Sequence, residues 1–106
     1  MKRYLYMFLT ILLSLILSSN TNTQIEDCKC KNIELKGRVK IVKNFANFKV
    51  KVVNSFADLK VKVVSSFPNK CGEWQFVDSG EDFTVQFVDA FADFKIMFVE
   101  QFPGTK

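Results

Sequence analysis

The chain has 106 residues, 48% of them hydrophobic and 25% charged, and it carries a formal net charge of +4 at pH 7. A chain of this length holds one small domain, and the complete lack of histidine removes the side chain that most often serves as general base or metal ligand. The acids around Gly80 lack the alternating spacing of a calcium loop and are interpreted as a solvated turn. We therefore expect no enzyme activity, no metal and no cofactor.

The N-terminus has the pattern of a secretory signal peptide over residues 1–23. Lys2 and Arg3 supply positive charge, residues 4–17 form an apolar run, and the small residues Thr21 and Thr23 suit a cleavage site. An uncleaved anchor would use the same run, but the run is shorter than the ~20 residues that a membrane-spanning helix needs. We expect cleavage after Thr23, a protein that is secreted or held in the periplasm or cell envelope, and no stable membrane anchor after cleavage.

Three cysteines follow the signal, at positions 28, 30 and 71. Disulfides persist outside the cytoplasm, so we expect Cys71 to pair with Cys30 or with Cys28 and to leave one thiol over. Cys28-Lys29-Cys30 could instead be half of a metal site. A lone C-x-C pair without histidine is a weak metal signal, and we favour the disulfide.

Residues 39–106 consist of six copies of an eleven-residue repeat, preceded by an N-terminal segment over residues 24–38. A three-residue hinge, residues 71–73, divides the copies into two triplets. The first triplet spans residues 39–70 and its third copy is one residue short, while the second triplet spans residues 74–106. The copies begin at residues 39, 50, 61, 74, 85 and 96. Positions within each copy are numbered from one to eleven below.

The columns of the repeat indicate short strands joined by turns. Positions one, three and four are apolar, and position two is polar in five of the six copies, as in a strand with one buried face. Positions three and four cannot share one flat strand face, so we expect a bend or cover there. Phenylalanine at position seven begins the turn, and Ala, Pro, Asn, Asp or Gly follow at positions eight and nine in most copies. An eleven-residue period also suits a helical supercoil, but β-branched runs and Phe-Pro steps favour strands.

Charge divides the repeats into a basic and an acidic triplet. Residues 36–70 hold nine Lys or Arg and one acid, a balance of +8, whereas residues 73–106 hold two Lys and seven acids, a balance of −5. The difference arises at two columns. Position two is lysine throughout the first triplet (Lys40, Lys51, Lys62) and never in the second, and position five is acidic throughout the second triplet (Asp78, Asp89, Glu100) and never in the first. We interpret the triplets as electrostatic partners within one domain, and a basic patch for an anionic polymer is the alternative.

Three features accompany the tandem units of the form V-K-V-V-x-S-F-x-D-x-K: a preceding Cys30, a Lys36-Gly37-Arg38-Val39-Lys40 approach to the first copy, and Cys71-Gly72-Glu73-Trp74 between the triplets. With these features, residues 28–106 resemble the 7(1) septoil knot domain of bacterial proteins, which are often exported. The chain departs from that pattern in its second N-terminal cysteine and in Gly80-Glu81, which replaces the phenylalanine of the fourth copy. The resemblance implies that the two triplets wind round each other into a seven-crossing knot, and it implies no catalytic or binding residues.

We therefore expect an all-β fold of short strands from six repeats in two interwound, deeply knotted triplets, with a small β-solenoid as the alternative. The expected function is an exported structural or interaction module that resists unfolding. The alternative is a binding protein for an anionic glycan or surface that uses the column Lys40, Lys51 and Lys62. Because the aromatic residues fall at columns expected to be buried, we expect no nucleic-acid partner. We expect a monomer, and the sequence identifies no partner.

Overall fold

The structure is a computed structural model and describes residues 25–105. Those residues form eight strands and no helix, which confirms the expected all-β class. Accordingly, the described part of the chain holds no helix that is long and apolar enough to cross a membrane. The expected signal peptide, residues 1–23, lies outside the described residues.

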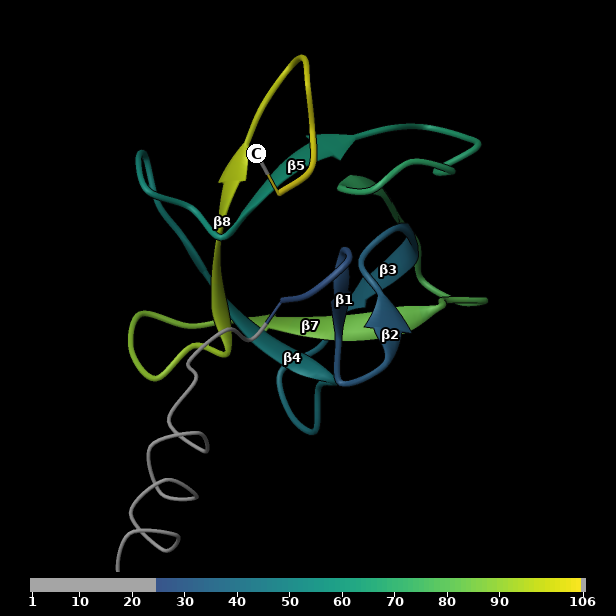
Figure 1. The fold of residues 1–106 in the computed structure, drawn as a ribbon. Coiled ribbons are helices and arrows are strands. Elements are labelled where there is room, and N and C mark those ends of the chain that lie inside the picture. Colours follow the sequence, from purple (N-terminus) through teal and green to yellow (C-terminus); the bar gives the residue numbers. More distant parts are fainter. Residues whose placement is uncertain (1–24, 106) are drawn as a thin grey trace, which may run out of the picture.

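A short hairpin and a closed barrel make up the fold (Figure 1). The hairpin consists of β1 (Lys29–Cys30) and β2 (Ile33–Glu34), which pair antiparallel. Six further strands pair in parallel and close into the barrel. They are β3 (Gly37–Ile41), β4 (Phe48–Val52), β5 (Leu59–Val63), β6 (Glu73–Phe76), β7 (Phe83–Phe87) and β8 (Phe94–Phe98).

The barrel alternates between the two triplets of the sequence. Its strand order is β3-β6-β5-β8-β4-β7, so every strand of the first triplet lies between two strands of the second. In β4, for example, Phe48 pairs with Val85 of β7, and Val52 pairs with Ile96 of β8. Neither triplet forms a sheet by itself. The ring closes, whereas an open β-solenoid would keep unpaired edges at its ends.

Three layers of apolar side chains fill the barrel. Four of the strands, β4, β5, β7 and β8, begin at position ten of the preceding copy, and their burial alternates so that positions ten, one and three face inward. β3, which precedes the first copy, shows the same alternation. The middle layer is position one, and all its members are 0% exposed: Val39, Val50, Val61, Trp74, Val85 and Ile96. This confirms position one as core. Position three is also on the inward face, at the end of each strand, but it is largely exposed there.

Position ten forms a second buried layer that the column analysis missed. Its members are Phe48, Leu59, Phe83 and Phe94, and Phe48 packs edge-on or tilted against two of them, with ring centroids 5.4 and 5.6 Å apart. The hairpin lies over this layer, because Cys30 and Leu35 join the same core cluster. Figure 1 shows β1 and β2 across the opening of the ring. One mouth of the barrel, where the strands begin, is therefore covered.

Loops leave each strand end, project outward around the barrel, and return to the next strand (Figure 1). At position nine, three aspartates anchor the returning chain to the opposite triplet. The backbone N–H of Asp82 donates to the carbonyl of Arg38 (2.7 Å), and its carboxylate accepts from the N–H of Arg38 (2.8 Å). Asp93 with Lys49 and Asp58 with Lys95 repeat the same pair of bonds. The turn residues of position nine are thus also cross-triplet anchors.

Gly37 is the glycine on which one of these anchors depends. Its φ of +122° lies outside the range of ordinary L-residues, and a Cβ there would collide with the carboxylate of Asp82. We expect Gly37→Ala to lower the free energy of unfolding by about 3 kcal/mol, from backbone strain and the displaced hydrogen bond. Equilibrium denaturation with the disulfide intact measures this.

Gly80→Ala is the matched control, because Gly80 also has a positive φ, +75°, but its Cβ would meet nothing within 4 Å. The control should cost only about 1 kcal/mol. Equal losses in the two variants would contradict the role assigned to the Asp82 anchor.

Candidate functional site

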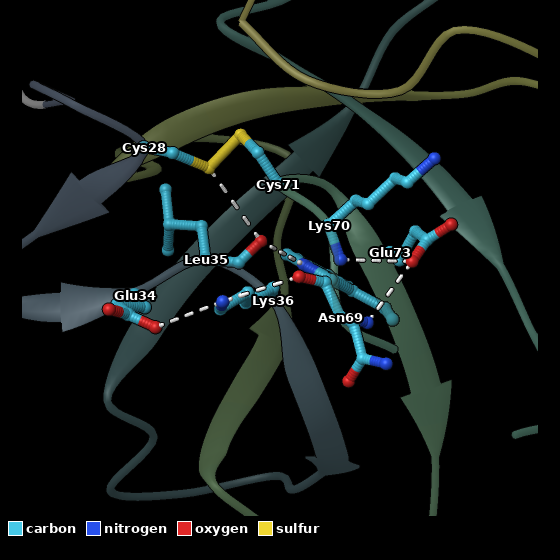
Figure 2. Close-up of a disulfide and its surroundings, with 9 residues drawn as sticks. Cys28, Glu34, Leu35, Lys36, Asn69, Lys70, Cys71 and Glu73 are labelled. Atoms are coloured by element: carbon cyan, nitrogen blue, oxygen red, sulfur yellow. Dashed lines mark hydrogen bonds and ion pairs between the residues drawn. A yellow bond between two sulfur atoms is a disulfide. The ribbon is translucent and has the colours of Figure 1, made fainter. Parts of the chain in front are cut away.

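A disulfide ties the hairpin to the loop between the two triplets (Figure 2). It joins Cys28 to Cys71, so of the two expected pairings the structure contains this one. The bond closes a loop with a sequence separation of 43 residues, which corresponds to a stabilisation of about 4 kcal/mol in the chain-entropy account. The disulfide thereby holds the loop between the triplets against the hairpin.

Cys30 is the remaining thiol, and it is buried in the barrel core. Burial raises the pKa of the Cys30 thiol, the ammonium group of Lys31 opposes that effect, and the carboxylate of Asp93 adds to it. The thiol is therefore held neutral and shielded at physiological pH. Residues 25–105 contain no group of three His, Cys, Asp or Glu side chains placed to hold a metal ion.

Glu73 organises the shortened third copy. Its Oε1 accepts hydrogen bonds from the backbone N–H of Asn69 (3.1 Å) and of Lys70 (2.9 Å), and its own N–H donates to the carbonyl of Lys70 (2.9 Å). Figure 2 shows the two bonds to the Glu73 carboxylate beside the disulfide. The carbonyl of Leu35 accepts from the Trp74 indole N–H (3.1 Å). The missing residue is thus compensated by side-chain hydrogen bonds that fix the loop.

A groove of about 470 Å³ runs between this loop and the chain that follows β8. Its chemistry combines two ammonium groups, an amide and an exposed phenyl ring beside a carboxylate already engaged by backbone N–H groups. Its volume lies in the range of small-molecule sites. Its lining residues are Lys62, Lys70, Cys71, Glu73, Gln101, Phe102 and Pro103.

The predicted lysine column does not form a continuous ladder. Lys40, Lys51 and Lys62 lie on β3, β4 and β5, which are separated from one another by strands of the second triplet. Their partners across the strands are Thr84, Lys95 and Glu73. Of the three, Lys62 lines the groove described above.

The outer wall of the barrel is nonetheless strongly basic. Positions eleven and two of the strands face outward and carry seven cations against one acid, Glu73. Within residues 25–105, the ion pairs are Lys31 with Asp93 (3.8 Å) and Lys36 with Glu34 (3.6 Å), and neither involves the wall. The seven cations are Arg38, Lys40, Lys49, Lys51, Lys60, Lys62 and Lys95.

The position-seven phenylalanines contradict the expectation that the aromatic columns are buried. Five loop phenylalanines are 81–102% exposed and adopt φ values of 54–59°, in the left-handed region. Hydrophobicity suggested burial, but the loops project away from the barrel and the left-handed turn directs these rings to solvent. The repeat pattern identified phenylalanine at position seven, but it did not predict that these side chains are exposed. The loop phenylalanines are Phe45, Phe56, Phe67, Phe91 and Phe102.

The described residues therefore define a small all-β protein in which a closed parallel barrel is assembled from two alternating sets of strands and tied by one disulfide. The family model for the 7(1) septoil knot domain matches residues 32–106, and the chain belongs to this family. No curated protein matches the chain. The family match confirms the resemblance drawn from the repeats.

Alkylation of cysteine tests the assigned pairing. We expect the native protein to resist iodoacetamide at neutral pH, because Cys30 is buried and its pKa is raised. After denaturation without a reductant, one adduct should form, on Cys30, and peptide mass spectrometry locates it. Modification of Cys28 in that sample would show that Cys71 pairs with Cys30 and would contradict the assignment.

Proposed function

We propose that this chain is an exported interaction module, resistant to unfolding, that acts outside the cell or at the cell envelope by non-covalent contact. The disulfide is consistent with an extracellular or periplasmic location. The observation that carries the proposal is the set of five loop phenylalanines, because their exposure serves no purpose within a single folded chain.

The energetics of these residues support a role in contact. A bulky L-residue in the left-handed region costs about 1 kcal/mol, and a side chain that is 81–102% exposed recovers almost nothing by burial. Five of the six copies place phenylalanine in this unfavourable position. Aromatic side chains, phenylalanine among them, are enriched at protein interfaces relative to the rest of the surface. A partner that covers these rings would offset their cost.

We also propose that the two triplets are interwound into a seven-crossing knot. The alternation of first- and second-triplet strands around the closed barrel supports this arrangement, because each triplet must pass repeatedly beside the other. Together with the disulfide, such threading would slow complete unfolding of the chain.

A second candidate function is binding of an anionic glycan or surface through Lys40, Lys51 and Lys62. The observation that favours it is the outer wall, with seven cations and one acid. The groove lined by Lys62, Lys70 and Phe102 adds an aromatic face to two cations, a combination suited to an acidic sugar.

Two variants separate these functions. In the first, the five loop phenylalanines are replaced by asparagine, which tolerates the left-handed region. We expect its resistance to denaturant to be unchanged or higher, and its co-sedimentation with isolated envelopes of the producing cell to be lost. In the second, Lys40, Lys51 and Lys62 are replaced by glutamate, and retention on immobilised heparin at moderate salt should fall if glycan binding is correct.

The control for charge replaces Lys29, Lys31 and Lys43 by glutamate, which alters net charge equally away from the wall. In the ion pair of Lys31 the lysine side chain is 57% exposed and that of Asp93 is 29% exposed, so loss of the pair should cost about 1 kcal/mol or less. Envelope binding that survives loss of the phenylalanines, or a cooperative loss of folding in that variant, would contradict the contact role. Equal heparin retention in both lysine variants would exclude the lysine column as the glycan site.

A further inference from the structure

The barrel has one covered mouth and one open mouth, and the open mouth is lined by apolar side chains. All strands run in parallel, so their last residues, at position three, meet at the mouth opposite the hairpin. Five of these six side chains are 39–52% exposed, although they face the barrel interior, and the sixth, Phe76, is half-buried. The exposed members are Ile41, Val52, Val63, Phe87 and Phe98. Such a layer would normally pack against another surface.

The charged columns of the two triplets interleave around this open mouth. Position two, just before the mouth layer, is lysine in each first-triplet strand, and position five, just after the strand, is acidic following each second-triplet strand. Lys43, at position five after β3, adds a second cation on that strand and keeps the sign of its place in the ring. Because the strands alternate around the ring, the charges alternate as well. The order is Lys40, Asp78, Lys62, Glu100, Lys51, Asp89.

These charges lie on neighbouring strands but are not joined in ion pairs. None of the six takes part in an ion pair within residues 25–105. Lys62 and Glu100 line the same hollow of about 180 Å³ at the rim, over Val63 and Phe98, without reaching each other within 4.0 Å. The basic and acidic columns therefore lie on neighbouring strands without forming ion pairs. Their ammonium and carboxylate groups are available to an outside partner.

We infer that the partner is a second copy of this chain, docked open mouth to open mouth. A two-fold axis perpendicular to the barrel axis, passing between two adjacent strands, reverses the ring order of one copy relative to the other. With strictly alternating charges, this operation places every cation of one copy opposite an acid of its partner. The rim is thus complementary to itself, as a closed two-fold dimer requires.

The arrangement also has the anatomy of a specific interface. An apolar centre, the position-three layer, is enclosed by a charged rim that can exclude water and fix the register. An anionic lipid surface would repel the three acidic groups of the rim. A polymer with charges of a single sign would likewise repel the three rim groups of that sign. A copy of the same face repels none. This inference goes beyond the contact role of the loop phenylalanines, and it differs from the sequence-based expectation of a monomer.

Sedimentation equilibrium on the purified exported protein tests the inference. We expect a monomer–dimer equilibrium, weakened at least about tenfold by Val52→Glu, which puts a charge into the apolar centre. Position 52 is already 46% exposed, so the variant should fold. Phe56→Glu is the control, because it places the same charge on a loop tip, 94% exposed, outside the mouth layer.

Reversal of the rim charges provides a second, independent test of the dimer. A variant with Lys40→Glu, Lys43→Glu, Lys51→Glu and Lys62→Glu makes every rim group acidic and should abolish the dimer. Adding Asp78→Lys, Asp89→Lys and Glu100→Lys to that variant restores strict alternation with the signs exchanged, and it should restore the dimer. No simple loss of folding produces such a rescue.

Several outcomes would overturn the inference. A monomer at every concentration would do so, as would association that requires added lipid vesicles, or a dimer that is insensitive to Val52→Glu. Equal loss with Phe56→Glu would move the contact to the loop phenylalanines, which would support the proposed function while refuting the mouth-to-mouth dimer.

Discussion

One backbone hydrogen bond recurs six times around the barrel and determines the rest of the fold. The N–H of the position-four valine donates to the carbonyl of a position-one residue in the opposite triplet, at 2.8–2.9 Å in every case. Because each bond crosses between triplets, neither can complete its backbone pairing without the other. The halves must therefore fold together, and their joining buries the position-one layer completely. The position-nine aspartates strengthen the same connection from the other end of three of the loops.

This cross-pairing also determines the chemistry of the surface. Each strand end must release its chain outward, so the loops project around the ring and carry phenylalanine into solvent. Alternation of the triplets turns a simple division of charge along the sequence into an alternating ring in space. The hairpin and its disulfide cover one mouth, which leaves the other as an apolar face. The stability of the barrel and the arrangement of its exposed residues thus have one common origin.

The sequence was informative where a residue's role is local and less so where the role depends on closure of the barrel. β-branched residues at position one predicted buried strands, and Asn or Asp at position nine predicted turns, since both depend on short-range preferences. Burial of position ten was missed because Phe48 and its equivalents belong to the strand that begins the next copy. The pairing of Cys28, rather than Cys30, depends on which side chain enters the core. The exposure of Phe45 and its equivalents depends on where the loops point, which periodicity does not encode. Of the lysine column, the sequence identified the residues but not their separation by intervening strands.

The pairing of every barrel strand with strands of the opposite triplet can be measured directly. A long-range HNCO experiment on labelled protein detects scalar couplings across individual N–H···O=C hydrogen bonds. We predict couplings from the amide nitrogen of Val42 to the carbonyl carbon of Val85, from Val53 to Ile96, and from Val88 to Val50. Couplings from these amides to carbonyls within their own triplet would contradict the alternating barrel and the account built on it.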